Sequence, residues 1–228
     1  MKRNSFAAFT LIEMLVVIAI IAVLAAFAVP ALTQALTRGQ LTGTMNNARQ
    51  LYLATFQMAT DGATNSDPNL SWPGDDTTLA AGTSLRDFCQ KLVQNDYLKA
   101  GDLQKMLNAP GANCTATADT ATPPALTLTG TSALKVYKVR EVDPSNTVFV
   151  ASSNYVYNAT PTSTAAPYGD KGFVVIRKGG DAGTFRKTQA TVANYSNDAN
   201  KFQGTIGKLT GDADGTLGTE AGKILTQP

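Results

Sequence analysis

The chain has 228 residues, enough for one membrane anchor and one globular domain, and its net charge of +2 with 16% charged residues gives no indication of nucleic-acid binding. It contains no histidine, which excludes Ser-His-Asp and Cys-His catalysis and any histidine metal site. No nucleophile–base pair or carboxylate dyad can be picked out, so we expect that the protein is not an enzyme.

The amino-terminal segment is an apolar run of membrane length that contains one carboxylate. Residues 9–32 are long enough to span a bilayer as a helix, which needs about 20 mostly apolar residues. Lys2 and Arg3 precede the run and favour a cytoplasmic amino end. Glu13 is the only formally charged residue between Asn4 and Thr37. A carboxylate at membrane depth is costly unless it has a partner, so Glu13 is a functional candidate.

Three interpretations of this run compete. It can be a plain anchor, a secretory signal peptide or a type IV prepilin signal. Ala26-Phe27-Ala28 is a small-x-small site of the kind that signal peptidase cuts, which would leave a secreted or membrane-tethered binding domain starting at Val29. Against a signal peptide, Glu13 would stand at the front of its apolar region, and that region would be too long.

The prepilin interpretation fits best. The residues Ala8-Phe9-Thr10-Leu11-Ile12-Glu13 resemble the cleavage and methylation site of type IV pilins and type II secretion pseudopilins. In that family a short basic leader ends in a small residue, Phe usually follows, and Glu lies four residues after it. Pro30 matches a proline that these proteins often carry about two-thirds of the way along the apolar segment. Ala8 departs from the family, which nearly always has Gly before the cut, so we expect slower cleavage. The resemblance covers residues 1–61 and is strongest over 2–32.

The resemblance implies a division of the chain into three parts. Residues 1–8 are a prepilin leader, 9–32 a transmembrane and filament-core helix, and 33–228 a periplasmic domain that includes the amphipathic half of the helix. Cleavage after Ala8 makes Phe9 the amino terminus, which the family methylates. Glu13 lies about one helical turn from Phe9 and is expected to pair with that cation, or with a neighbour's, in the filament core.

The implied partners are the prepilin peptidase, a secretion or pilus assembly platform, the inner membrane and other copies of the chain. The protein would be a structural subunit of a type II secretion pseudopilus or a type IV pilus. The insert at 63–83 and the lack of a carboxyl-terminal cysteine loop favour the pseudopilus slightly.

The helix is predicted to continue beyond the membrane. Apolar and small residues recur at helical spacing on one face: Leu41, Met45, Ala48, Tyr52, Thr55 and Ala59. Gln50 falls on the open face. Asp61-Gly62 is a reasonable stop, with Gly in a left-handed cap, and Pro30 should bend the helix.

The rest of the chain reads as turns, short helices and strands. Turns are predicted at 67–69 and 72–75, and a helix begins at Ser84, capped with Asp87, with one apolar face formed by Leu85, Phe88, Cys89, Leu92 and Val93. A short helix is expected within 101–107 and an irregular stretch at 110–124. Strands are expected at 134–142, 147–152, 173–177 and 184–189, the last two as an antiparallel hairpin. This order predicts an α+β fold in which the sheet covers the helix stripe, as in the ladle-like pilin fold that the resemblance implies.

Two further sites are predicted. Cys89 and Cys114 are the only cysteines, and an even pair beyond a membrane anchor favours a disulfide over two buried free thiols. Asp212 and Asp214 stand in an Asp-x-Asp-Gly sequence that resembles part of a calcium loop, with Glu220 or Asp198 as possible further ligands, although ordinary turns use the same residues. Major pseudopilins bind calcium near their carboxyl ends, which favours such a site. No other cofactor is expected.

Two groups of side chains have a structural and a binding interpretation. Trp72, Tyr155 and Tyr157 either fill the core or bind a ligand, and the core is the more common place for such aromatics. The basic residues around the predicted hairpin are best explained as a solvated sheet edge: Lys171, Arg177, Lys178, Arg186 and Lys187.

Overall fold

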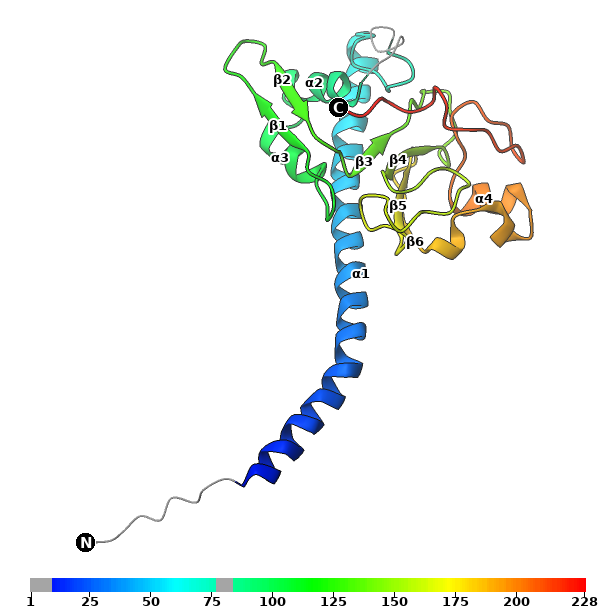
Figure 1. Cartoon of the computed structure of the whole chain (residues 1–228). Coiled ribbons are helices and arrows are strands. Elements are labelled where there is room, and N and C mark those ends of the chain that lie inside the picture. Colours follow the sequence, from blue (N-terminus) through cyan, green and yellow to red (C-terminus); the bar gives the residue numbers. More distant parts are fainter. Residues whose placement is uncertain (1–9, 77–83) are drawn as a thin grey trace. The chain divides into compact units, whose positions relative to one another are not determined.

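The computed structural model describes residues 10–76 and 84–228 (Figure 1). Helix α1 runs from Leu11 to Asn65, and the chain divides into two compact units within this helix, between Gly39 and Gln40. The predicted cleavage site at Ala8 and Phe9 lies outside the described residues, as does part of the predicted insert, residues 77–83.

Helix α1 continues through Pro30, and the hydroxyl of Thr33 donates a hydrogen bond to the Pro30 carbonyl at 2.9 Å. The predicted stop at Asp61-Gly62 is wrong, because the helix ends four residues after Asp61, at Asn65. Gly62 is buried inside the helix, where a Cβ atom would lie 1.7 Å from the carbonyl oxygen of Leu70. Gly62 therefore permits a close backbone approach, and Ser66 takes the left-handed conformation after the helix, with φ of 56°.

A four-stranded antiparallel sheet forms the larger part of the core, in the order β3-β4-β5-β6. Its strands are β3 (Leu134–Val136), β4 (Val148–Ser152), β5 (Phe173–Arg177) and β6 (Ala182–Phe185). The predicted hairpin is confirmed, because β5 pairs with β6 and Phe173 lies opposite Phe185.

Two of the predicted strands are shorter in the structure. The first stops at Val136. The next residue, Tyr137, still donates its amide to the Phe149 carbonyl of β4 at 2.8 Å, and it also forms an isolated bridge with Ile224 in the carboxyl-terminal segment. The last also begins two residues before its predicted start, at Ala182; it stops at Phe185 and is followed by the 3-10 helix η2 (Lys187–Gln189). Local alternation of residue types could not reveal these partners, which are distant in sequence.

A second, two-stranded sheet corrects the prediction of an irregular stretch at 110–124. Strand β1 (Thr115–Ala118) pairs antiparallel with β2 (Leu126–Thr129). Leu126 and Leu128 are buried, whereas Thr127 and Thr129 between and after them are exposed. Strand β1 consists of small threonine and alanine side chains, and only Ala116 points inward, so its sequence lacks the alternation of large apolar and polar residues that predicts a strand.

Both predicted short helices are confirmed, as α2 (Leu85–Gln94) and α3 (Ala100–Met106). Ser84 caps α2 by accepting a hydrogen bond from the Asp87 amide, and the predicted apolar face of α2 is buried. These helices and the β1-β2 hairpin lie on one side of the carboxyl-terminal part of α1, and the four-stranded sheet lies on the other (Figure 1). The chain closes with η3 (Val192–Tyr195) and α4 (Ala199–Thr205).

The predicted stripe of α1 is the centre of this core. Leu41, Ala48, Tyr52 and Thr55 are buried, Met45 and Ala59 are half-buried, and Gln50 is exposed. Leu51 and Met58 are buried as well, so the buried face is wider than predicted because layers cover α1 on two sides. Trp72, Tyr155 and Tyr157 belong to the core, at 3%, 0% and 5% exposure.

The β5-β6 hairpin lies along α1 in a fixed register. A Cβ atom at Gly180, in the turn, would lie 2.9 Å from the Tyr52 ring, and one at Gly172, before β5, would lie 2.9 Å from Leu41. The turn of the hairpin therefore meets the middle of the buried face of α1, and the open end of the hairpin meets its beginning.

Candidate membrane anchor and assembly site

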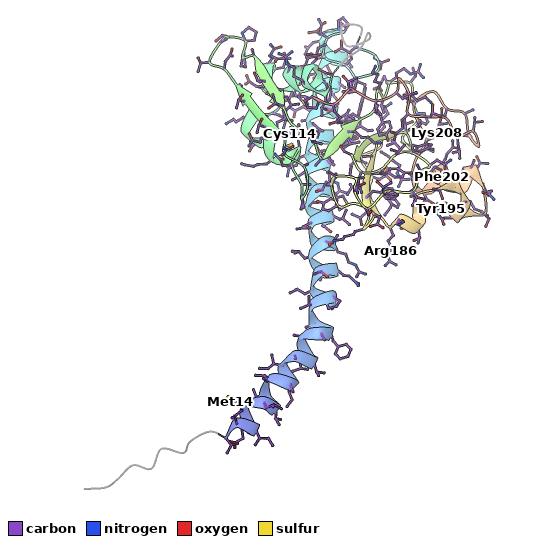
Figure 2. All side chains as sticks on the ribbon, in the orientation of Figure 1. Met14, Cys114, Arg186, Tyr195, Phe202 and Lys208 are labelled. Carbon is purple, nitrogen blue, oxygen red and sulfur yellow. The ribbon has the colours of Figure 1, made fainter. Side chains whose placement is uncertain are left out.

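The first part of α1 has an apolar surface on all sides. Its large apolar side chains between Leu11 and Leu36 are 47% to 86% exposed, and they surround the helix around Met14 (Figure 2). Within the described residues, α1 is the one helix long and apolar enough to cross a membrane. Exposing so much contiguous apolar surface to water is unfavourable in free energy, so this segment requires lipid or other helices around it.

Glu13 is held against the beginning of the helix by Thr10. The Thr10 amide and hydroxyl both donate to the Glu13 carboxylate, at 2.8 and 2.7 Å, and the Glu13 amide donates to the Thr10 hydroxyl at 3.3 Å. This reciprocal arrangement is a capping box, which satisfies amides that have no partner inside the helix. Unpaired amides are especially costly in hydrocarbon, so the capping box suits a helix that begins within a membrane.

The sequence-based prediction gave Thr10 no role as a helix cap. Thr10-Leu11-Ile12-Glu13 has the Ser/Thr-x-x-Glu spacing of a capping box, which was a sufficient signal. The Glu13 carboxylate thus has a partner within its own chain, Thr10, which directly follows Phe9 in the sequence.

The comparison with known proteins agrees with this site. A family model described as the prokaryotic N-terminal methylation motif matches residues 3–29. No curated protein and no solved structure matches the chain.

The α+β fold begins with an exposed apolar helix that is long enough to cross a membrane, which fits a membrane-anchored pilin. The chain carries the prepilin motif of type IV pilins and pseudopilins, as the resemblance around Ala8 and Glu13 indicated. That motif marks structural proteins, which are generally not enzymes.

The two cysteines lie in the same apolar core, Cys89 on α2 and Cys114 just before β1. They are free thiols in the structure, so the predicted disulfide is not formed there. Burial raises the pKa of both thiols, and the neighbouring Cys114 raises that of Cys89 further. Because the thiolate is the form that reacts, thiols in this environment are slow to exchange once the domain has folded.

The carboxylates proposed as calcium ligands have other partners. Asp212 is paired with Lys223, and Asp214 with Lys208 at 2.8 Å. Asp198 caps α4 by accepting from two backbone amides, at 3.0 and 3.1 Å. No group of three or more His, Cys, Asp or Glu side chains gathers anywhere in residues 10–76 and 84–228. The donor set therefore does not fit a calcium ion, because lysine ammonium groups occupy the carboxylates.

Glu220 lies instead at the centre of a buried polar cluster. Its carboxylate accepts from the Lys135 ammonium at 2.7 and 2.8 Å, from the Tyr137 hydroxyl, and from the Tyr157 amide at 2.8 Å. The side chains of Lys135 and Glu220 are 6% and 11% exposed. This cluster fastens the carboxyl-terminal segment to strand β3, and the sequence held no local signal for it because its members are up to 85 residues apart.

Proposed function

We propose that this protein is a structural subunit of a type II secretion pseudopilus or a type IV pilus. The prepilin peptidase cuts it after Ala8, Phe9 is methylated, and an assembly platform polymerises it through α1. Before assembly it is a single-pass inner-membrane protein with its globular domain in the periplasm. The observation that carries the proposal is an apolar helix of membrane length with one carboxylate, Glu13, within the matched methylation motif.

The capping box supports a specific role for Glu13 in assembly. Cleavage after Ala8 would place a new ammonium group one residue before Thr10, about one turn from the Glu13 carboxylate. An unpaired cation in the apolar core of a filament costs several kcal/mol, so the carboxylate compensates it. Because Thr10 already orients the carboxylate toward the helix end, the pair forms with little loss of side-chain freedom.

The alternative, a secreted or tethered binding domain cut before Val29, has less support. Helix α1 continues without a break through residues 26–28 and on into the core. Mass spectrometry of the mature protein separates the two functions: we expect a methylated Phe9, whereas a start at Val29 or an intact leader contradicts the filament proposal.

Substitution of Glu13 tests assembly itself. We expect Glu13→Val to be inserted and cleaved but to form no ordered filaments in electron micrographs, because the ammonium group loses its counter-charge. Thr10→Val is the matched control, since it removes the capping hydroxyl and keeps the carboxylate, and it should still assemble. Equal loss of filaments in both variants would show that Glu13 acts through the cap, and normal filaments from Glu13→Val would contradict the pairing argument.

A further inference from the structure

An acidic groove lies at the carboxyl-terminal end of α1. It encloses about 550 Å³, room for a few side chains, and we call it the distal groove. Its apolar floor includes Ala59, Ala63 and Leu70, and three carboxylates, from Asp67, Asp75 and Glu141, line it without any lysine or arginine.

The charge of the distal groove is poorly compensated. Asp67 accepts from the backbone amide of Asn69 at 2.9 Å, and Asp75 accepts from the backbone amide of Glu141. Neither carboxylate has a cation within 4.0 Å among the residues the structure describes, and Glu141, whose side chain is 74% exposed, has only Lys178, at 3.9 Å. The groove therefore favours a cationic partner.

An apolar strip adjoins the groove. Leu53 and Phe56, on the open face of α1, are 56% and 49% exposed, and the Phe56 ring contacts Trp72, which lines the groove, at 6.4 Å between ring centroids. Apolar area beside a charged groove is the composition of a protein interface.

A basic patch lies at the opposite end of the same compact unit. The register that pairs Phe173 with Phe185 brings Lys171, Arg186 and Lys187 to the open end of the β5-β6 hairpin, and Figure 2 shows Arg186 at the edge of the domain. Lys187 is paired with Asp170 at 2.8 Å. In the described part of the chain, no carboxylate lies within 4.0 Å of the Lys171 or Arg186 side chain.

These two surfaces cannot meet within one chain. The open end of the hairpin lies over Leu41, and the groove begins near Gly62. At 1.5 Å per residue, these positions on α1 are separated by about 30 Å.

We propose that the distal groove of one copy receives the basic patch of a second copy, with the two helices parallel and displaced by about 30 Å. The two surfaces differ, so the contact is head-to-tail, and a head-to-tail contact that does not close into a ring generates an open filament. This proposal rests on the proposed filament function and adds the surface that sets the axial spacing of the globular domains.

Carbodiimide crosslinking of the assembled full-length protein tests the contact. The reagent joins a carboxylate directly to an amine, so we expect peptides in which Lys171 or Lys187 is linked to Asp67, Asp75 or Glu141. Such a link must join two chains because of the separation within one. The exposed Lys105–Asp102 pair, at 3.1 Å, reports that the reaction has worked. Absence of the interchain link while the Lys105–Asp102 link is present overturns the proposal.

Charge reversal gives a second test. Arg186→Glu and Glu141→Lys should each lower the amount of filament, measured by sedimentation and electron microscopy, by about tenfold, because like charges then face each other. The double variant should recover most of the loss. Lys201→Glu, on α4, changes the net charge by the same amount as Arg186→Glu but outside both surfaces, and it should assemble normally.

The outcomes separate this proposal from the function on which it rests. If the wild-type protein assembles and both reversals assemble equally well, the head-to-tail contact is overturned and the filament function stands. If the wild-type protein does not assemble with its platform, the filament function is overturned and the contact falls with it. Near-ultraviolet circular dichroism of each variant checks that the domain remains folded.

Discussion

The cluster around Glu220 allows a quantitative prediction about the stability of the globular domain. Glu220→Gln keeps an acceptor for the Tyr157 amide and the Tyr137 hydroxyl but removes the charge that faces Lys135. Burial lowers the pKa of Lys135, and the Glu220 carboxylate opposes that shift. The variant therefore leaves a buried ammonium group without its counter-charge.

The expected loss in the free energy of unfolding is about 3–5 kcal/mol at pH 7, the usual effect of removing one partner of a buried ion pair. Release of the proton from Lys135 in the folded state sets an upper limit on this loss. Lysine in the unfolded chain has a pKa of about 10.4, and each pH unit is worth about 1.4 kcal/mol, so a folded state with neutral Lys135 costs about 5 kcal/mol at pH 7. In a unit of this size the loss corresponds to roughly 10 °C in Tm.

Thermal melting of the full chain in detergent, followed by near-ultraviolet circular dichroism, measures this loss. The deficit of Glu220→Gln should shrink from pH 7 toward pH 10, because the unfolded state binds the extra proton and that advantage declines as pH approaches the unfolded pKa. Lys135→Met combined with Glu220→Gln should recover most of the stability. Asp102→Asn, in an exposed pair, should cost at most about 1 kcal/mol. A neutral Glu220→Gln, or a double variant as unstable as the single one, would refute the reasoning.

Three other predictions concern the same domain. Tyr52→Asp should destabilise it by several kcal/mol, because Tyr52 is 7% exposed, whereas Gln50→Asp on the open face should be nearly neutral in urea melts; the reverse order would show that the helix face is misassigned. Burial raises the pKa of all seven tyrosines, that of Tyr97 to about 12, so their contribution to stability should be fully present below pH 10 and be lost as the pH rises above it. Absorbance titration should show ionisation delayed until unfolding; seven reversible ionisations near pH 10 in folded protein would contradict this. We also predict that Cys89 and Cys114 form a disulfide in exported protein, because they share one core; two thiols that can be alkylated in the unreduced, denatured protein would exclude it.

The sequence by itself determined the features that depend on neighbouring residues. The anchor, the spacing from Phe9 to Glu13 and the buried face of α1 all follow from short periodic patterns, and so does the cap of α2 at Ser84. The capping box at Thr10 was equally readable. These features are local because a helix brings together residues three and four positions apart, whatever the rest of the chain does.

Only the tertiary structure decided which distant residues meet. The Asp-x-Asp-Gly spacing at Asp212 and Asp214 suggested a cation site, but in the structure both carboxylates form ion pairs with lysines. Strand β1 was hidden because its small side chains acquire a pattern only when β2 lies beside it. The same holds for Lys135 and Glu220, which come together only when the carboxyl-terminal segment folds back over β3. Ion pairs between remote residues depend on topology and produce no periodic pattern in the sequence.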